Sequence, residues 1–358
     1  MNKNKKQFKL SEIGSMYLLS GLVAVTAICM GTWFGYQYFA GNVNSTAIID
    51  LIREEKENQC EHERVLDGVC VESEEEVNPK LVAVMIDNHS EARPQSGLAD
   101  ASVVYEAPVE GNFSRYMVIY PTHAEVDKVG PVRSARPYFL DWLSEYGDAM
   151  YMHVGGSPEA LGRIVDEDVN DYNEFRYGNN FWRDGNRYAP HNTYTSSNLW
   201  NKLLDKYEDQ YSKINYDGWN FGEIENCIEN CTDDINVSYL YISYDVVWKY
   251  NTSTAKYLRY LAGAKHKDTE GKQIEADTII IQKVESQVID NVGRLKIDTI
   301  GDGEAIVFRG GEKVEGVWKK ESLSGRTKWF DKNGEEIIIK SGKIWIEVSN
   351  ERTEVEYN

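Results

Sequence analysis

The strongest constraint on this chain is a long uncharged segment close to its N-terminus. No charged residue occurs between Glu12 and Asp50, and the apolar centre of the segment runs from Met16 to Trp33. That length approaches the roughly 20 residues that a helix needs to cross a bilayer. Four lysines precede the segment and aromatic residues follow it, as at a cytoplasmic flank and an interfacial aromatic belt. The sequence therefore predicts a cytoplasmic tail over residues 1–12 and a transmembrane helix over residues 13–40, with the bulk of the chain extracytoplasmic.

Two alternative N-terminal signals fit this segment less well. A cleaved signal peptide has a shorter apolar core and ends at a small-x-small site, a pattern that "YQYFAG" (36–41) lacks. A lipid-attachment cysteine needs a small residue before it, whereas Ile28 precedes Cys29. We therefore expect single-pass anchoring in the cell membrane through one N-terminal helix.

The charge of the chain excludes one large class of partner. The formal net charge is −19 and the sequence pI is about 4.8. Because binding to nucleic acid depends on basic residues that neutralise phosphates, we expect no nucleic-acid partner. With 358 residues, the chain can form one large domain or two medium domains with sizeable cores.

Four of the five cysteines form two close pairs, Cys60 with Cys70 and Cys227 with Cys231. An oxidising compartment outside the membrane favours a disulfide in each pair. Metal binding is the alternative, but it requires the two separated pairs to converge, and no histidine lies beside them at zinc-finger spacing. We therefore predict two disulfides, no metal and no cofactor.

Residues 41–80 have the composition of a stalk. The stretches "REEKENQCEHER" and "VESEEEVNPK" are polar and charged, and residues 72–76 contain four glutamates that repel one another. Such a run favours a solvated, extended segment. We predict an acidic stalk here, with a small loop closed by the first cysteine pair.

Beyond the stalk, the apolar pattern divides the chain into two regions. In residues 81–225, runs of strand length such as "LVAVMID" (81–87) alternate with helical segments such as "PYFLDWLSEYG" (137–147). This alternation predicts an α/β or α+β domain. Residues 235–358 contain strand-like stretches separated by turns, such as "KNGE" (332–335), and predict a β-rich second domain. Ser157 precedes Pro158 at a helix start, so we interpret it as an N-cap.

Two arginines stand at the start of the first predicted helix. In "GPVRSARPY" (130–138), Arg133 and Arg136 precede a proline of the kind common at the first helical position. A helix start already carries partial positive charge, so two further positive charges require a compensating anion. Guanidinium groups bind phosphates and carboxylates in bidentate fashion. The anion is therefore either a bound ligand or an internal carboxylate, such as Asp87, Glu106 or Asp141.

Other polar residues also stand at the ends of predicted strands. Because ligands in open α/β sheets bind beyond the carboxyl ends of the strands, these residues are candidates for one cleft. The candidate ligand-binding residues are Arg93, Arg115, Arg133, Arg136, Arg183 and Asn192. The candidate catalytic residues, as acids, bases or orienting groups, are Asp87, His89, Glu106, His153 and His191. Structural hydrogen bonding is the alternative for each, and metal binding by the histidines with Asp87 is another.

Six segments carry a resemblance to a known family. They are, in order, "VAVMIDNHSEARPQSGL", "VVYEAPVEGNFSRYM", "VGPVRSARPYFLDW", "YMHVGGSPEAL", "FWRDGNRYAPHNTYTSSNLW" and "YLRYLAGAKHKDTEGKQIEADTIIIQ". Together they resemble the YerB-like family of bacterial envelope proteins, often lipoproteins, with two domains of unknown function. The resemblance covers about residues 80–350 and implies a membrane-tethered extracytoplasmic protein, but no reaction. The predicted membrane helix and the cysteine-closed stalk loop depart from the lipoprotein pattern.

Two functions of different classes are consistent with these features. The first is a module that binds an anionic cell-envelope ligand or a protein partner through an arginine-rich cleft. The second is an enzyme that modifies a cell-wall polymer with the Asp, His and Glu cluster. We favour the first because no motif completes a catalytic set. Four tryptophans of the β-rich region are interpreted as core residues rather than as a sugar-binding row: Trp248, Trp318, Trp329 and Trp345.

Overall fold

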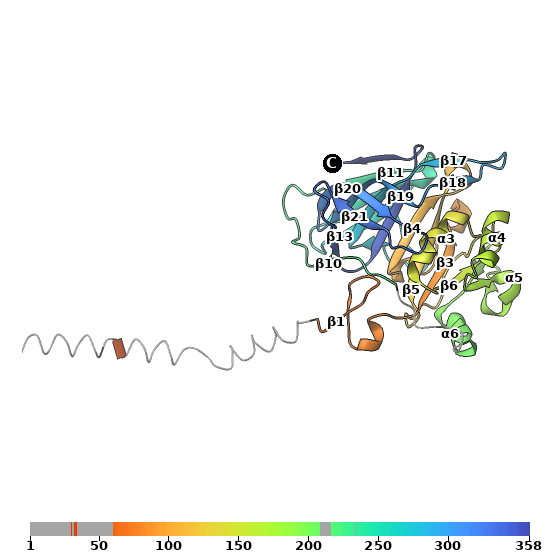
Figure 1. The fold of residues 1–358 in the computed structure, drawn as a ribbon, viewed down its shortest axis with the longest axis horizontal. Helices are drawn as coiled ribbons and strands as arrows, with labels where there is room; N and C mark the ends of the chain where they lie inside the picture. The colour runs from red at the N-terminus through yellow and green to blue at the C-terminus, as the bar shows by residue number, and fades with distance from the viewer. Residues whose placement is uncertain (1–29, 31, 34–59, 208–215, 233) are drawn as a thin grey trace, which may run out of the picture. The chain divides into compact units, whose positions relative to one another are not determined.

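The computed structural model describes residues 30, 32–33, 60–207, 216–232 and 234–358. Of the predicted membrane span, only Met30, Thr32 and Trp33 are described, and each is helical. The rest of that prediction, together with the tail over residues 1–12, lies outside the described residues. Within the part of the chain that is described, no helix has the length and hydropathy needed to cross a membrane. The chain divides into two compact units, Met1–Cys60 and Glu61–Asn358, and the second contains the sheets and helices that are labelled in Figure 1.

A mixed sheet of ten strands forms the centre of the second unit. In spatial order the strands are β21 (Lys328–Asp331), β20 (Glu312–Lys320), β19 (Gly301–Arg309), β16 (Thr278–Lys283), β23 (Ile344–Ser349), β4 (Val103–Pro108), β5 (Ser114–Pro121), β3 (Leu81–Asp87), β6 (Met150–His153) and β7 (Asp171–Asn173). Since β5 runs antiparallel to both β3 and β4, those two strands end at the edge where β5 begins.

A second sheet lies against one face of the first. Its strands are β14 (Ala264–Lys265), β13 (Lys256–Leu261), β12 (Asp245–Asn251), β11 (Asp234–Ser238) and β24 (Glu354–Tyr357), with β15 (Glu275–Ala276) paired to β13. One buried cluster joins this sheet, through residues such as Val237 and Trp248, to Val84 and Ile281 of the large sheet. The remaining strands form short pairs: β1 (His62–Glu63) with β2 (Cys70–Val71), β8 (Trp182–Arg183) with β9 (Thr193–Tyr194), β10 (Phe221–Gly222) with β22 (Ile339–Lys340), and β17 (Ser286–Val288) with β18 (Leu295–Ile297).

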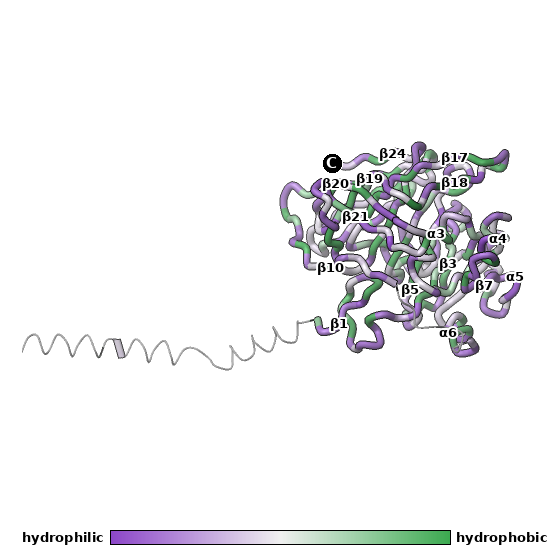
Figure 2. Tube along the Cα trace, in the orientation of Figure 1, coloured by the Kyte–Doolittle hydropathy of each residue, from purple (hydrophilic) through white to green (hydrophobic). Residues whose placement is uncertain are grey.

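Helices complete the packing of the large sheet. They are α3 (Pro137–Leu143), α4 (Pro158–Asp166), α5 (Glu174–Tyr177) and α6 (Ser197–Lys206). Phe139 of α3 and Ile164 of α4 pack with Ala83 and Met85 of β3, whereas Val82 and Val84 of β3 belong to the cluster on the opposite face. Both faces of β3 are therefore covered, which explains its continuous apolar run. Figure 2 shows hydrophobic residues along the strands and hydrophilic residues in the outer loops.

The two predicted regions share the large sheet. Strand β23 of the C-terminal region pairs in parallel with β4 of the N-terminal region, and Glu347 lies opposite Glu106 in the register. The C-terminal region is rich in strands, as predicted. Its four tryptophans are buried, with exposed fractions of 2% or less, which confirms their interpretation as core residues.

The predicted secondary-structure elements around the candidate cleft are confirmed. The apolar run 81–87 forms β3, and the segment that begins at Pro137 forms α3. Ser157 is the N-cap of α4, where its hydroxyl accepts a hydrogen bond of 3.3 Å from the backbone N–H of Ala160. Ser196 is the N-cap of α6 but makes no such side-chain bond.

Residues 61–80 differ from the extended stalk that the sequence predicted. Leu66 is fully buried in the core, and the backbone carbonyl of Asp67 accepts a hydrogen bond from Gly342. The guanidinium of Arg64 holds Asp67 with two hydrogen bonds of 2.7 Å. The burial of apolar residues between the acidic stretches thus outweighs the repulsion between the glutamates, and this segment packs onto the domain. Residues 41–59 of the predicted stalk lie outside the described residues.

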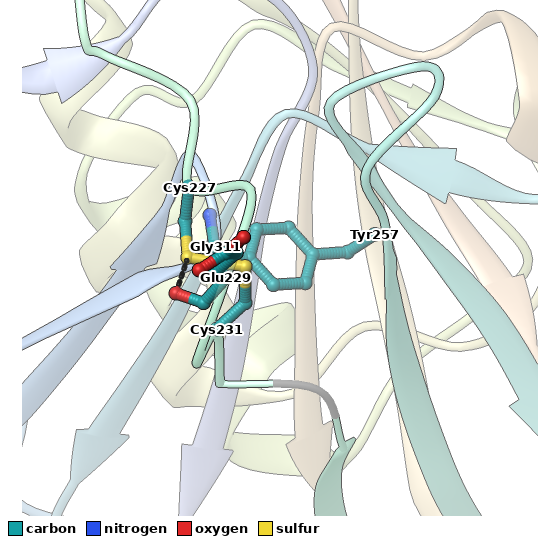
Figure 3. The surroundings of a disulfide bond; sticks show 5 residues. All are labelled: Cys227, Glu229, Cys231, Tyr257 and Gly311. Atoms are coloured by element: carbon teal, nitrogen blue, oxygen red, sulfur yellow. Dashed lines mark hydrogen bonds between the residues drawn. A yellow bond between two sulfur atoms is a disulfide. The ribbon is translucent and has the colours of Figure 1, made fainter.

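Both predicted cysteine pairs are oxidised. Cys60 and Cys70 are disulfide-bonded, and Cys227 is bonded to Cys231. Figure 3 shows the second bond beside Gly311 and Tyr257. The backbone of this loop is held by the turn between β19 and β20, because the N–H of Cys227 donates to Gly310 at 2.7 Å and the N–H of Thr232 donates to Gly311 at 2.9 Å. The disulfide therefore closes a loop that is fastened to the large sheet.

Candidate functional site

A cavity of about 390 Å³ opens at the sheet edge where β3 and β4 end and β5 begins. We call it the arginine pocket. Six of the residues predicted from strand ends line it: Asp87, His89, Arg115, Arg133, Arg136 and His191. The prediction of a shared concavity beyond the strand ends is therefore correct for these six residues.

Asp87 is the centre of the polar contacts in the pocket. Its Oδ2 accepts hydrogen bonds from Nε of Arg133 at 2.9 Å and from Nδ1 of His191 at 2.7 Å. Its Oδ1 accepts from the backbone N–H of His89 at 3.0 Å. Burial opposes ionisation of this carboxyl, but the His191 hydrogen bond and the charges of Arg115 and Arg133 outweigh it and lower the pKa of Asp87. Asp87 is therefore an anion that orients two neighbouring side chains.

The two arginines before α3 both have internal partners. Arg133 bonds Asp87, one of the three carboxylates considered in the sequence. Arg136 forms a bidentate pair with Glu110, with distances of 2.6 and 2.8 Å to its two carboxylate oxygens. The positive charge next to the helix start is therefore compensated by Glu110, which the sequence reasoning did not name.

Arg115 has no comparable partner. It is 6% exposed, and its Nη1 donates to the backbone carbonyl of Ser134 at 2.8 Å. Its buried Nε has no hydrogen-bond partner among the described residues. Burial lowers the pKa of Arg115 to about 10, and the charges of Arg136 and Arg133 act in the same direction. The pocket thus contains a buried guanidinium that no carboxylate of the described chain hydrogen-bonds.

The outer wall of the pocket is apolar. Phe113 stacks on Tyr244 with ring centroids 5.2 Å apart, and it also contacts Tyr241 at 5.0 Å. Val292, at the turn between β17 and β18, lines the same pocket and is 65% exposed. A ligand with one charged group and one apolar or ring-shaped part matches this combination of walls.

The two histidines of the pocket lie against each other. His89 stacks on His191 with ring centroids 4.6 Å apart. Nε2 of His191 lies 3.5 Å from a carboxylate oxygen of Glu91, and Nδ1 of His89 lies 3.9 Å from it. Among the described residues, His89, Glu91 and His191 form the group whose ligand atoms are close enough to hold a metal ion.

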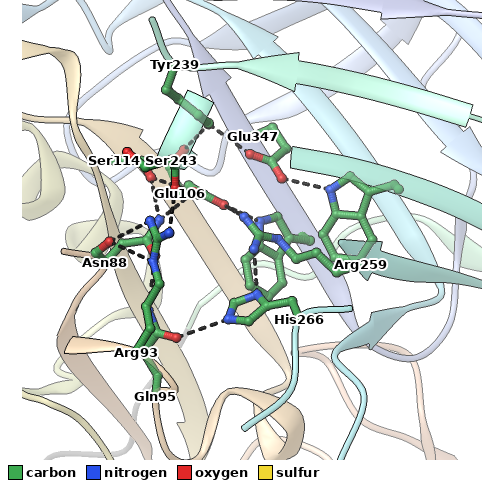
Figure 4. Close-up of polar contacts among 12 residues, drawn as sticks. Asn88, Arg93, Gln95, Glu106, Ser114, Tyr239, Ser243, Arg259, His266 and Glu347 are labelled. Carbon is green, nitrogen blue, oxygen red and sulfur yellow. Dashed lines mark hydrogen bonds and ion pairs between the residues drawn. The ribbon is translucent and has the colours of Figure 1, made fainter. Parts of the chain in front are cut away.

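Glu106 belongs to a buried network behind the pocket, shown in Figure 4. Its carboxylate accepts hydrogen bonds from Ser114 at 2.6 Å and from Arg259 at 2.5 Å, and all three side chains are buried. Glu347 lies in the same network and accepts bonds of 2.8 Å from Tyr239 and Trp248. Burial and the charge of Glu106 raise the pKa of Glu347 to about 8. Glu106 therefore ties β4 of the large sheet to β13 of the second sheet, and it does not line the pocket.

Arg93 belongs to the same buried region. Its guanidinium donates to Asn88 at 2.8 Å and to the backbone carbonyl of Ser243, and it lies over the ring of Tyr244 at 4.8 Å. His266 contacts Arg259 at 2.6 Å and Gln95 at 3.0 Å in this network (Figure 4). These side chains are used for internal contacts, so the ligand-binding role predicted for Arg93 has no support from its surroundings.

Three other predicted residues lie away from the arginine pocket. His153 is fully buried, and its two ring nitrogens contact Asp171 at 2.5 Å and the carbonyl of Gly155 at 2.7 Å. Arg183 bonds Asn192 and Glu174, each at 3.1 Å. None of the three lines the pocket. His153 ends β6, Arg183 belongs to β8 and Asn192 directly precedes β9, and each makes internal contacts instead.

Sequence reasoning missed Glu91, Glu110 and the apolar wall. Glu110 follows β4 in "EGN", so its place after a strand was a usable signal. Tyr244 and Val292 come from the second region, and no local pattern places them beside β3. Glu91 lies two residues after His89 in a short 3-10 turn, and its relevance depends on His191, which lies far away in the sequence.

Comparison with known proteins assigns the chain to a family. Residues 66–213 match the "Protein of unknown function (DUF3048) N-terminal domain", and residues 235–346 match the corresponding C-terminal domain. The chain therefore belongs to the DUF3048 family, and the resemblance seen in the sequence is confirmed. It is 32% identical over 280 residues to the "Putative lipoprotein YerB" of Bacillus subtilis, which covers 75% of this chain and 80% of that protein. The crystal structure of YerB matches with a TM-score of 0.71 at 29% identity and covers 82% of this chain and 99% of that chain.

Proposed function

We propose that this protein is a membrane-anchored, extracytoplasmic binding protein that takes an anionic group of a cell-envelope ligand or partner in the arginine pocket. The supporting observation is Arg115, a buried guanidinium at the pocket whose Nε has no hydrogen-bond partner among the described residues. Leaving a buried charged donor unsatisfied is costly, so a bound phosphate or carboxylate at this position would stabilise it.

The charge and size of the pocket agree with this proposal. The three lining arginines face two lining carboxylates, Asp87 and Glu110, which leaves one positive charge in excess. A volume of about 390 Å³ falls in the range of small-molecule pockets. The pocket therefore suits a single anionic group attached to a small ring or an apolar moiety, which packs against Phe113 and Tyr244.

Titration of the purified full-length protein tests this proposal. The probes are glycerol 3-phosphate, which carries a phosphate ester, and N-acetylmuramic acid, which carries a sugar carboxylate. We expect at least one probe to bind, and Arg133→Ala to weaken binding by about 10- to 100-fold, the loss expected for a charge-assisted hydrogen bond. The matched control is Arg176→Ala on α5, an exposed arginine outside the pocket. Failure of both probes to bind, or equal binding by both variants, refutes the proposal.

A second candidate function rests on the contact between Asp87 and His191. A carboxylate that accepts a hydrogen bond from Nδ1 of a histidine at 2.7 Å can orient that histidine as a general base. In this alternative the protein modifies a cell-wall polymer. Incubation with peptidoglycan should then release new fragments, and Asp87→Ala should abolish them while the protein stays folded. An absence of product, together with probe binding that depends on Arg133, favours the binding protein.

We also propose that residues 13–40 anchor the protein, with the N-terminus in the cytoplasm. The uncharged segment and its flanking lysines support the helix, and the relative named as a lipoprotein supports membrane anchoring outside the cytoplasm. Protease added to cells stripped of their wall should digest the chain beyond residue 41. Full protection of that region refutes the topology, and a lipid on Cys29, detected by mass spectrometry, replaces the helix by an acyl anchor.

A further inference from the structure

We propose that His89, Glu91 and His191 form a binding site for a divalent transition-metal ion, with zinc as the ion whose preferences fit best. Two imidazoles and one carboxylate are a common zinc ligand set, and such three-ligand sites leave a fourth position open for water or another ligand. The site lies at the edge of the arginine pocket, which His89 and His191 line. It does not rest on the proposed anion binding, because its ligand atoms are distinct from the arginines.

The hydrogen bond between His191 and Asp87 supplies the first argument. Asp87 is paired with Arg133 and accepts this bond, so Nδ1 of His191 is the donor and Nε2 is left to face Glu91. A carboxylate that accepts a hydrogen bond from the other ring nitrogen fixes the tautomer and orientation of most metal-binding histidines. Arg133 holds the same Asp87 oxygen, which keeps the carboxylate in place.

The spacing between Glu91 and His191 supplies the second argument. Two ligand atoms bound to a tetrahedral zinc at about 2.0–2.1 Å lie about 3.3 Å from each other. Nε2 of His191 and the carboxylate oxygen of Glu91 are 3.5 Å apart, which is longer than a hydrogen bond but close to this ligand separation. With the hydrogen on Nδ1, Nε2 of His191 and the Glu91 oxygen both present lone pairs, and a cation between them relieves their repulsion.

His89 completes the site after a small movement. Its Nδ1 lies 3.9 Å from the same carboxylate oxygen and accepts only a long bond of 3.3 Å from the backbone N–H of Glu91. The two imidazole planes are inclined by 14°, so their lone pairs do not meet at one point until His89 turns out of the stack. The side chain of His89 is 42% exposed, which leaves room for that rotation.

Glu91 supplies the negative charge that the site needs. Among the ion pairs of the described residues, Glu91 contacts only His89 and His191. Asp87, in contrast, is already paired with Arg133. Nitrogen and oxygen ligands of this kind suit borderline ions such as zinc, whereas magnesium and calcium prefer oxygen ligands alone.

The experiment is a zinc titration of the full-length protein after removal of metal by a chelator. We expect one zinc ion per chain, measured by calorimetry and by the metal content of the gel-filtered protein. Loss of a residue that hydrogen-bonds a metal ligand typically weakens metal binding by 10–100-fold. Glu91→Gln and His191→Ala remove ligands themselves, so each should weaken zinc binding at least tenfold. Because the Glu91 side chain is 74% exposed, Glu91→Gln should leave the melting temperature unchanged. His123→Ala is the matched control and should bind zinc like the wild type.

A wild-type protein that binds no zinc overturns the proposal, and so does zinc binding that neither Glu91→Gln nor His191→Ala weakens. The two proposals are measured separately, because Glu91 does not line the arginine pocket, and Glu91→Gln is expected to weaken zinc binding and retain probe binding. Magnesium chloride at the same concentrations serves as the second probe, and equal binding of magnesium and zinc also contradicts a site built from two imidazoles.

Discussion

Replacing Glu106 by glutamine should destabilise the protein without altering the arginine pocket. Its carboxylate lies among four donors: Arg259 at 2.5 Å, Ser114 at 2.6 Å, and Asn88 and Trp345 at 3.3 Å each. Glutamine has nearly the same volume, so no cavity forms. It offers one acceptor oxygen in place of two and removes the charge that balances the buried guanidinium of Arg259.

The expected loss in the free energy of unfolding is about 3 kcal/mol. Removing one partner of a buried ion pair costs about 3–5 kcal/mol, because the other charge is left uncompensated. Glu347 moderates this loss: with Glu106 neutral, the like charge that helps to raise the pKa of Glu347 disappears, so Glu347 can ionise beside Arg259. The value should therefore lie at the lower end of the range.

Equilibrium urea unfolding at pH 7 measures this loss, and tryptophan fluorescence is a suitable signal because Trp248 and Trp345 belong to the network. The matched control is Glu304→Gln. This residue pairs with Lys283 at the surface, where the side chains are 74% and 47% exposed, and surface pairs contribute about 1 kcal/mol or less. A loss below about 1 kcal/mol for Glu106→Gln, or a loss of probe binding in a stable variant, would refute the structural role.

Two further predictions concern Glu347 and Ser157. The pKa of Glu347 is raised to about 8 from an ordinary 4.5. Between these two pH values the unfolded chain has released a proton that the folded chain keeps. The contribution of Glu347 to the free energy of unfolding therefore falls as pH rises, by up to about 1.4 kcal/mol per pH unit. Glu347→Gln removes that slope, so the stability of the variant relative to the wild type should increase between pH 5 and 7.5 in urea titrations. A constant difference contradicts the raised pKa of Glu347. Burial lowers the pKa of His266, but His266 is present in both proteins and does not affect the comparison. Ser157→Ala should lower the free energy of unfolding by about 1 kcal/mol, because it removes the side-chain cap of α4. Ser196→Ala is the control and should cost clearly less, because Ser196 makes no side-chain cap bond. Equal losses of stability in thermal melts would show that the lost cap is not the cause.

Much of the fold was readable from local patterns. The apolar run 81–87 predicted β3 because a strand covered on both faces needs apolar residues on both. Proline at the first helical position predicted the starts of α3 and α4. The rule that ligands bind beyond the ends of strands led to eleven candidate catalytic and ligand-binding residues, and six of these line one pocket.

The pairing of charges was not readable in the same way. Arg136 is compensated by Glu110, 26 positions away, and Glu106 by Arg259, 153 positions away. Which carboxylate pairs with which arginine depends on the loops and strands that meet in the fold. No local sequence pattern specifies these pairs, because any carboxylate of an acidic chain is an equally good candidate partner for an arginine.

The sequence by itself determined the strand and helix positions, the oxidised cysteine pairs and the family, because these depend on local spacing and residue type. Only the tertiary structure decided that the two family domains share one sheet, that residues 61–80 pack onto it, and that Glu106 is a buried structural group. The physical reason is that Glu347 and Glu106 come together through the pairing of β23 with β4, and backbone pairing between segments so far apart in the sequence depends on the assembly of the whole sheet.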